Sequence, residues 1–283
     1  MLLDLPKVEL FQLRTGQAKL KIDKFNERIR LISFTAEAEE LVERLGFLAK
    51  KYKLGKIIYV VTKEEVKIFT NFGFIVEAEV EGLLKGEKGY FLSKFTIPER
   101  GRSNQVKLAE EVLLQAKGYR QEESNPPLKE GYEIRNVSLD DAKEIAVLYD
   151  TVFATYPTPM NDPRYVAAVM QDNLIFKAAI CDKQIISVAS ADLDPDNLNA
   201  EITDCATSPK HRGNGLMERL ISELEEELRQ KNYLTAYTIA RSVSSGINIV
   251  FAKRGYHYSG RMINNCHICG QFEDMNIWNK GLK

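Results

Sequence analysis

Alternating and continuous apolar runs beyond residue 131 predict a series of short strands separated by amphipathic helices. Strands are expected at 132–137, 174–181, 185–193, 199–207, 234–241, 257–268 and 272–279. Helices are expected to begin at Ser138 and Asp162 and to span 215–231 and 245–254. Ser138 followed by Asp141 has the spacing of a capping box, and Asp162-Pro163 supplies an N-cap with a proline at the first helical position. The predicted order is β-α-α-β-β-β-α-β-α-β-β.

The first 120 residues repeat the end of that order in a weaker form. Helices are predicted at 36–53 and 63–71, and strands at 56–61, 76–84 and 89–95. The alignment that carries the repeat pairs three positions: Gly73 with Gly255, Phe74 with Tyr256, and Phe69 with Phe251. This pattern indicates a degenerate internal repeat. The alternative is an unrelated α+β domain.

A polar segment at 118–131 separates these two parts and contains Pro126-Pro127. Two successive prolines exclude helix and favour an extended connector. We therefore divide the chain into an N-terminal domain at 1–120, a linker at 121–131 and a C-terminal domain at 132–283. The fold class is α/β (α+β), with a central mixed, mostly antiparallel sheet preceded by a smaller α+β domain.

Composition excludes several classes of function. The 283 residues carry 39 basic and 40 acidic side chains, for a formal net charge of −1. This balance gives no electrostatic footprint for nucleic acid or for an anionic membrane. The first residues do not resemble a signal peptide, and no apolar run approaches the ~18 residues that would cross a bilayer. Four cysteines are too few for a disulfide scaffold, so we expect reduced thiols and a cytoplasmic protein.

The stretch 200–220, AEITDCATSPKHRGNGLMERL, carries the clearest chemistry. A predicted strand runs through a basic loop into Arg212-Gly213-Asn214-Gly215, and a predicted helix follows. Glycines let successive backbone N–H groups converge on an anion, and a helix N-terminus adds positive potential. The stretch therefore predicts a phosphate-binding loop.

Strand, RGxG and helix, followed by strand, helix and a Gly-aromatic pair, resemble the GNAT superfamily of acetyltransferases. The signature of that superfamily, Q/R-x-x-G-x-G/A, falls here on Arg212, Gly215 and Met217. Met217 stands where a small residue is usual, which we expect to alter the helix approach without abolishing the site. The resemblance implies the GNAT fold over 132–280, with acetyl-CoA as co-substrate. It places the acetyl-CoA contacts at Cys205, Ala206, Thr207, Arg212, Gly213, Asn214, Gly215, Leu216, Met217, Ser244 and Phe251.

A narrower resemblance rests on five blocks: YPTP at 156–159, NAEITDCAT at 199–207, TAYTIARS at 235–242, INNC at 263–266 and EDMN at 273–276. Together they resemble the β-lysine N-acetyltransferases, which make the compatible solute N6-acetyl-β-lysine from L-β-lysine and acetyl-CoA. That family also carries an extra domain ahead of its catalytic one. The resemblance implies an osmoprotective enzyme that acts on a small diamino acid.

Acetyl transfer to an amine needs a base, because the nucleophile must be neutral and a lysine-type ammonium has a pKa near ~10.4. Glu201 is the first candidate, since a similar A-E-I-x-x-C-A strand carries the catalytic glutamate of the GNAT histone acetyltransferases. The alternative is a strand glutamate that merely faces solvent. Asp204 would point to the opposite face of a regular strand, but a β-bulge would change that parity and let it bind the substrate ammonium.

The general acid is left open. Many GNAT enzymes protonate the departing thiolate with a tyrosine four residues before the Gly-aromatic pair, where this chain has Phe251. Either Tyr256 or Tyr258 takes that role, or the thiolate leaves unassisted.

Further polar residues are candidates for binding the acceptor, each with a structural alternative: Tyr156, Asn264, Asn265, Glu273 and Asp274. The asparagines stand mid-strand, where asparagine is disfavoured, and the two acids would suit a diamino substrate. The segment Cys266–Cys269 lacks the further ligands that zinc needs, so no metal is expected. Cys205 is interpreted as a small core residue rather than a nucleophile.

The leading function is therefore acetylation of L-β-lysine. One alternative is an N-acetyltransferase for another small polyamine or for a protein lysine, and the other is a non-catalytic acetyl-CoA sensor. Phe251 favours the sensor, whereas Glu201 and Asp204 count against it. A homodimer is left open.

Overall fold

The computed structural model describes residues 8–121, 127–172 and 174–283. Within them the C-terminal half follows the predicted order closely. Both predicted helix starts are present: Ser138 and Asp141 form a capping box, and the Asp162 carboxylate accepts from the Arg164 N–H. The elements are β7 (Tyr132–Asn136), α4 (Ala142–Val152), α5 (Pro163–Met170), β8 (Leu174–Cys181), β9 (Gln184–Asp194), β10 (Asn199–Thr207), α6 (Leu216–Gln230), β11 (Thr235–Arg241), α7 (Ser245–Lys253), β12 (His257–Ile268) and β13 (Gln271–Gly281).

The N-terminal half contains more structure than its sequence pattern predicts. The predicted elements are present as α1 (Ala38–Tyr52), β4 (Lys56–Val61), α2 (Lys63–Asn71), β5 (Ile75–Leu84) and β6 (Glu87–Phe95). The structure adds β1 (Val8–Gln12), β2 (Gln17–Asp23), β3 (Arg28–Phe34) and α3 (Val106–Lys117). None of the described helices has the length and apolar character needed to cross a membrane.

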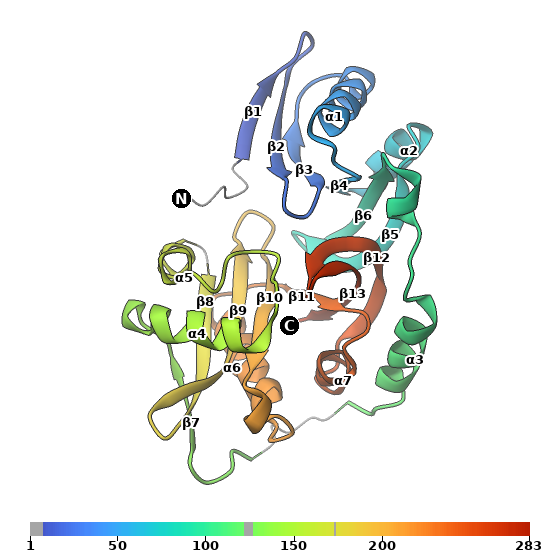
Figure 1. Cartoon of the computed structure of the whole chain (residues 1–283). Coiled ribbons are helices and arrows are strands. Elements are labelled where there is room, and N and C mark those ends of the chain that lie inside the picture. The colour runs from blue at the N-terminus through green and yellow to red at the C-terminus, as the bar shows by residue number, and fades with distance from the viewer. Residues whose placement is uncertain (1–7, 122–126, 173) are drawn as a thin grey trace.

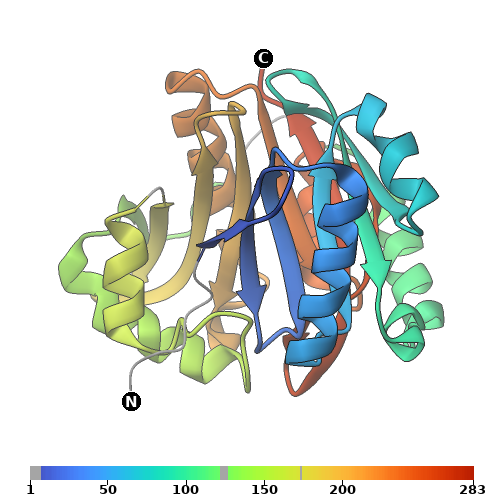
Figure 2. The same ribbon diagram turned by 90° about the horizontal axis from the view of Figure 1, so that it is seen from above.

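All thirteen strands of the described residues join one mixed sheet, in the order β1-β2-β3-β4-β6-β5-β12-β13-β11-β10-β9-β8-β7 (Figure 1). The two halves meet where β5 pairs with β12, through Ala78 and Gly260. Helices α4 and α5 lie at one side of the molecule, and α1, α2 and α3 lie at the other (Figure 2).

The series β2-β3-α1-β4-α2-β5-β6 has the same order and sheet positions as β9-β10-α6-β11-α7-β12-β13. Local details agree as well. In the β2–β3 turn the Asn26 backbone and side chain donate to Asp23, and in the β9–β10 turn Asn197 donates to Asp194 in the same way. The two aligned glycines, 73 and 255, have φ of 80° and 78°. The chain therefore contains an internal repeat.

The helix α3 precedes the predicted linker but packs against α7 of the C-terminal half. Its Leu113 and Ala116 belong to the same apolar core as the buried leucines of α6. Because α3 shares a core with the C-terminal half, the predicted boundary at 121–131 does not separate two independent cores, and the division into domains stays a prediction. Residues 122–126 of the predicted linker lie outside the described residues.

The neighbouring strands β10 and β11 part midway along their length. Their parallel pairing covers only Asn199–Glu201 against Thr235–Tyr237, although both strands continue. A bulge lies in β10 between Thr203 and Ala206, with Asp204 at φ 51°. The bulge changes the parity of the strand, since Ile202 packs in the α6 core while Ala206 packs in the α4 core. Residues of both strands beyond the paired positions line a cavity.

The N-terminal half fixes the backbone of β12 where this strand has its own irregularity, between Met262 and Cys266. Three buried or half-buried cations donate to successive β12 carbonyls, at 2.8, 2.8 and 2.9 Å: Lys56 to Ile263, Arg100 to Asn264 and Arg28 to Asn265. Hydrogen bonds from charged donors are stronger than neutral ones. The geometry of β12 beside the site thus depends on both halves.

Candidate active site

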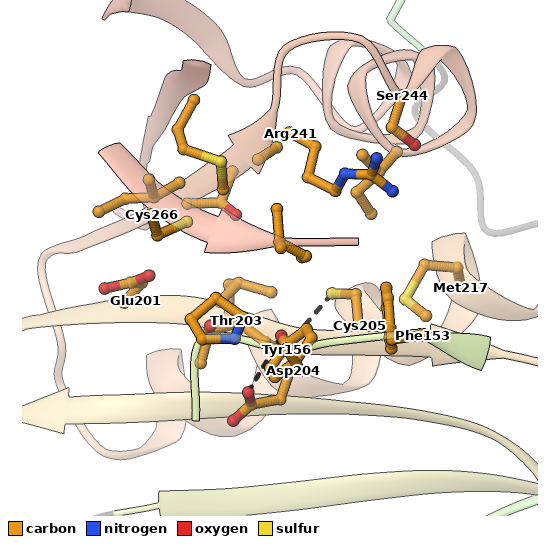
Figure 3. A pocket seen from close by; sticks show the side chains of 18 of the residues that line it. Phe153, Tyr156, Glu201, Thr203, Asp204, Cys205, Met217, Arg241, Ser244 and Cys266 are labelled. Carbon is orange, nitrogen blue, oxygen red and sulfur yellow. Dashed lines mark hydrogen bonds between the residues drawn. The ribbon is translucent and has the colours of Figure 1, made fainter. Parts of the chain in front are cut away.

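A cavity of about 1050 Å³ opens where β10 and β11 part, and residues of both halves line it. Figure 3 shows Glu201, Thr203, Asp204 and Cys205 along one wall. Arg241, Ser244 and Cys266 stand along the facing wall. A cavity of this size accommodates a drug-sized ligand with room to spare, so two reactants fit together.

The glycine loop before α6 forms part of the wall. Gly213 and Gly215 have φ of 77° and 70°, in the left-handed region that favours glycine. The helix α6 begins after Gly215 without a side-chain cap. The first N–H groups of a helix have no partner within it and carry positive potential. This loop therefore fits the pyrophosphate of acetyl-CoA.

The facing edges of β10 and β11 supply the next part of the site. Beyond Glu201 and Tyr237 these edges have no register with each other. Backbone N–H and C=O groups need partners, and an extended ligand with its own amide groups can pair with a free strand edge. Ser244, the N-cap residue of α7, lines the same space. The gap thus fits the amide-bearing arm of coenzyme A.

Glu201 lies at the last paired position of β10, where the strands part. The Tyr237 hydroxyl donates to its carboxylate at 3.4 Å, and Asp192 of β9 is its direct cross-strand neighbour. Burial raises the pKa of Glu201 to about 7; Arg30 opposes this rise, and Asp192 adds to it. A base whose pKa is near the working pH is suited to proton transfer.

Asp204 occupies the bulge, and its carboxylate accepts hydrogen bonds from Ser190 Oγ at 2.9 Å and from the Tyr156 hydroxyl at 3.2 Å (Figure 3). The Tyr149 hydroxyl donates to the Asp204 backbone carbonyl. Burial raises the pKa of Asp204 to about 6, while the two side-chain hydrogen bonds act in the opposite direction. Asp204 therefore keeps a negative charge inside the cavity at neutral pH.

Comparison with known proteins agrees with this geometry. Residues 141–256 match the acetyltransferase (GNAT) family. The chain is 34% identical to the β-lysine N(6)-acetyltransferase of Methanococcus maripaludis, over 92% of this chain and 95% of that protein. It belongs to the GNAT acetyltransferases, in the family of that enzyme.

Two more relatives extend the comparison. The chain is 33% identical to the β-lysine N(6)-acetyltransferase of Methanosarcina mazei, over 87% of this chain and 98% of that protein. It is 32% identical to the N-acetyltransferase YodP of Bacillus subtilis, over 94% of this chain and 96% of that protein. The protein is thus a GNAT N-acetyltransferase that uses acetyl-CoA as its acetyl donor.

The cavity of this GNAT acetyltransferase brings together most of the predicted site residues. They come from the loop after α4, from β10, from the glycine loop with the start of α6, from the N-cap of α7, and from β12. The lining includes Tyr156, Glu201, Asp204, Cys205, Thr207, Arg212, Gly213, Gly215, Leu216, Met217, Ser244 and Asn265.

Three predicted acetyl-CoA contacts lie outside the lining. Ala206 is buried in the core beneath α4, on the parity that the bulge imposes. The Asn214 amide donates to the Tyr132 hydroxyl and to the His211 carbonyl, so it holds the loop together. Phe251 is fully buried, with its ring edge-on to Tyr256 at 4.9 Å. The side chains of these three residues therefore pack or hydrogen-bond within the protein, and their contact with acetyl-CoA stays a prediction.

Three predicted substrate residues also point elsewhere. The Asn264 amide donates to the carbonyls of Arg100 and Arg102. Glu273 holds Arg241 through two hydrogen bonds of 2.6 Å. Asp274 accepts from the Asn264 N–H and from the Ser103 hydroxyl. The side chains of these three residues thus bind other groups of the protein, and their direct contact with the substrate stays a prediction. Arg241, which Glu273 orients, does line the cavity.

Neither tyrosine that was considered as the general acid lines the cavity. Tyr256 is buried next to Glu225, and Tyr258 packs edge-on to Trp278 at 5.7 Å. In the described part of the chain, no group of three or more His, Cys, Asp or Glu residues has an arrangement that could hold a metal ion.

Sequence reasoning missed the contribution of the N-terminal half. Lys21, Arg28 and Arg30 line the cavity from β2 and β3, and Asp192 lines it from β9. The alternation of charged and apolar residues in KIDKFNERIRL was a usable signal, because it places these cations on one face of a hairpin. The sequence of that segment alone does not indicate which part of the protein the cationic face of the hairpin contacts.

Proposed function

We propose that this GNAT acetyltransferase transfers the acetyl group of acetyl-CoA to the N6 amine of L-β-lysine. The position of Glu201 carries the proposal, because the carboxylate stands where the strand gap meets the acidic end of the cavity. Relatives over nearly the whole chain that bear the name β-lysine N(6)-acetyltransferase support the choice of acceptor. The compatible-solute role that the resemblance implies is part of the same proposal.

The reaction follows from the residues that meet there. The substrate arrives as an ammonium, and Glu201 in its ionised form takes one proton from it. The neutral amine then attacks the thioester carbonyl and the new C–N bond forms. The nitrogen gives up its remaining extra proton to solvent, and the C–S bond breaks as the thiolate leaves. The free edge of β10 presents backbone N–H groups toward the gap, which suits the negative charge that develops on the carbonyl oxygen.

Asp204 contributes through its charge. Its carboxylate is held by Ser190 and Tyr156, so its position is fixed before the substrate binds. A fixed anion beside the path of an ammonium favours its binding, and a charge in buried surroundings attracts more strongly than one in bulk water. No tyrosine at positions 251, 256 or 258 is placed to protonate the thiolate, so we propose that it leaves without that assistance and takes a proton from solvent.

The test is a turnover assay with acetyl-CoA and a panel of amines: L-β-lysine, L-lysine, spermidine and a lysine-containing peptide. We expect L-β-lysine to give the highest kcat/KM and the acetyl group to be found on N6 by mass spectrometry and NMR. Preferred acetylation of spermidine or of the peptide would replace the proposed acceptor. Binding of acetyl-CoA without turnover of any amine would favour the sensor.

A further inference from the structure

Three cations of the N-terminal half project toward the cavity from the hairpin β2–β3. Lys21 and Arg30 are directly opposite each other in the antiparallel register, and Arg28 lies two residues before Arg30 on the same face. Like charges at opposed strand positions destabilise a sheet. A half-buried pair of this kind therefore costs the folded protein free energy, which makes a purely structural reason for it hard to find.

The cations are incompletely neutralised. Arg28 is paired with Asp23 at 3.0 Å and donates to the Asn265 carbonyl at 2.9 Å. Among the residues that the structure describes, the side chains of Lys21 and Arg30 make no hydrogen bond and no ion pair within 4.0 Å. Burial lowers the pKa of Lys21, and Arg30 lowers it further, which is the expected effect of a neighbouring cation. An anion placed between these side chains would remove the repulsion.

The cavity also contains a pair of opposed side chains that carry negative charge instead of positive charge. Glu201 and Asp192 are also directly opposite each other, on β10 and β9. The internal repeat relates the two pairs. The strand β3 begins its parallel pairing with Arg28 opposite Lys56, and β10 begins its own with Asn199 opposite Thr235, so Arg30 and Glu201 occupy the same place in each copy. Their partners Lys21 and Asp192 correspond likewise.

One further polar side chain of the cavity lining has an atom without a partner. Asn265 lines the cavity with only 3% of its surface exposed, and its side-chain oxygen accepts no hydrogen bond within the described structure. Its backbone carbonyl is the one that Arg28 holds. A buried acceptor without a donor costs the folded protein free energy, so the hydrogen-bonding capacity of this side chain beside the cavity is incompletely used.

We propose that Lys21, Arg28 and Arg30 form a carboxylate-binding subsite, which makes the N-terminal half the part of the protein that selects amino acids over simple polyamines. The inference rests on the proposed function. An acceptor with an ammonium at one end and a carboxylate at the other neutralises both pairs of like charges at once. The carboxylate of a diamino acid then meets the cations, while its ammonium groups meet the part of the cavity that Glu201, Asp192 and Asp204 line.

The subsite is separate from the phosphate loop of acetyl-CoA. The phosphate loop lies at Arg212–Gly215, before α6. The cations lie near the carboxylates instead, since Arg30 and Arg28 lower the pKa of Glu201 and Asp192 raises that of Lys21. A change in the subsite should therefore alter the use of the amine and leave acetyl-CoA binding unchanged.

The experiment compares two acceptors that differ only in charge, L-β-lysine and its carboxamide, in the wild-type protein and in Arg30→Gln. Loss of charge-assisted hydrogen bonds lowers binding affinity roughly 10- to 100-fold, so the KM for L-β-lysine should rise by about that factor with little change in kcat. The carboxamide should be a poor acceptor for the wild type, and Arg30→Gln should make it no poorer. Arg30→Lys, which keeps the charge, should lose less than Arg30→Gln.

Lys21→Gln and Lys19→Gln form a matched pair, since both remove one charge from β2 but Lys19 is exposed and outside the cavity lining. Only Lys21→Gln should raise KM for L-β-lysine. Acetyl-CoA affinity, measured by calorimetry, confirms that each variant is folded. Equal losses on both acceptors, or a loss of acetyl-CoA affinity with unchanged KM for the amine, would overturn the subsite.

The wild type alone separates the two proposals. Equal use of L-β-lysine and its carboxamide would overturn the subsite and leave the acetyltransferase assignment in place. No turnover of either acceptor would overturn the proposed substrate, and the subsite would fall with it.

Discussion

Glu201 shows how its surroundings adapt a single carboxylate to base chemistry. Burial disfavours its ionised form, Asp192 across the strand pair adds repulsion, and Arg30 on the opposite wall partly offsets both. The resulting pKa of about 7 leaves a useful fraction ionised at neutral pH. A typical exposed glutamate would be fully ionised there but would be a much weaker base.

Glu201→Gln should lower kcat by roughly 10²- to 10⁴-fold, the usual size of a general-base contribution. The wild-type rate should rise through pH 7 as Glu201 loses its proton. The variant should lack that rise, and its residual rate should instead increase toward the pKa of the substrate amine, near ~10.4. Steady-state rates from pH 5.5 to 9.5 test this, with acetyl-CoA affinity as the control. A variant with the wild-type rate at pH 7 would rule Glu201 out as the base.

Glu201→Gln should lower kcat but make the folded protein more stable at alkaline pH. Glu201 titrates near 4.5 when exposed and near 7 in the folded protein, so the folded state holds an extra proton between these values. Stability attributable to this group therefore falls as pH rises through that window. Glu201→Gln should unfold at a higher temperature than the wild type at pH 8 and at about the same temperature at pH 4. An equal difference at both pH values would point to packing instead of ionisation.

At the scale of elements, α6 and α1 occupy equivalent places in the two copies but complete their N-termini differently. Neither helix has a side-chain cap, but only the start of α6 lines the cavity. At α1, Glu40 of the first turn accepts from the N–H groups of Arg14 and Thr15, and these hydrogen bonds, with that of the Thr15 hydroxyl, lower the pKa of Glu40 to about 2. A fixed carboxylate there complements the helix dipole and repels a phosphate.

Gly213→Val should weaken acetyl-CoA binding at least tenfold, because a β-branched residue resists the positive φ that aims the loop N–H groups. Gly131→Val is the matched control. Gly131 has a φ of 85°, and at both glycines an added Cβ would meet no atom within 4 Å, but Gly131 lies outside the cavity lining. Calorimetry should show normal affinity for the control. Equal loss in both variants would attribute the effect to backbone strain alone.

At the scale of the whole molecule, the two copies of the repeat have different roles. The strands β3 and β4 also part, beyond Leu31 and Tyr59, but aromatic rings fill the space there. The Phe34, Tyr59 and Phe69 rings contact one another with centroids 5.1 to 5.9 Å apart. The gap in the first copy is thus occupied by aromatic side chains. This copy instead contributes the cations that line the cavity and the three cationic side chains that donate to the β12 carbonyls.

The full-length protein should therefore bind one acetyl-CoA per chain. Isothermal titration calorimetry gives the stoichiometry directly, and Gly213→Val identifies the site that is occupied. A second saturable site would contradict this assignment of one site to the second copy. So would a Gly213→Val variant that still binds one acetyl-CoA per chain with wild-type affinity.

The sequence determined the parts of this protein that depend on local signals. The glycine loop, the helix caps and the apolar stripe of α6 are each encoded within a few residues, because φ preference and helical spacing act over that range. The strand containing Glu201 and the aligned glycines at 73 and 255 were predicted for the same reason. The strands of residues 8–34 were missed, since their charged faces lack the apolar runs that mark a buried strand.

Only the tertiary structure decided which side chains meet. A bulge places Asp204 in the cavity, and an irregularity in β12 turns Asn265 inward while Asn264 binds the loop at Arg100. Each irregularity breaks the period of two on which a sequence prediction of strand faces relies. Arg30 and Glu201 line the same cavity because the two copies join a single sheet. Their proximity is set by long-range packing, for which neither segment carries a local signal.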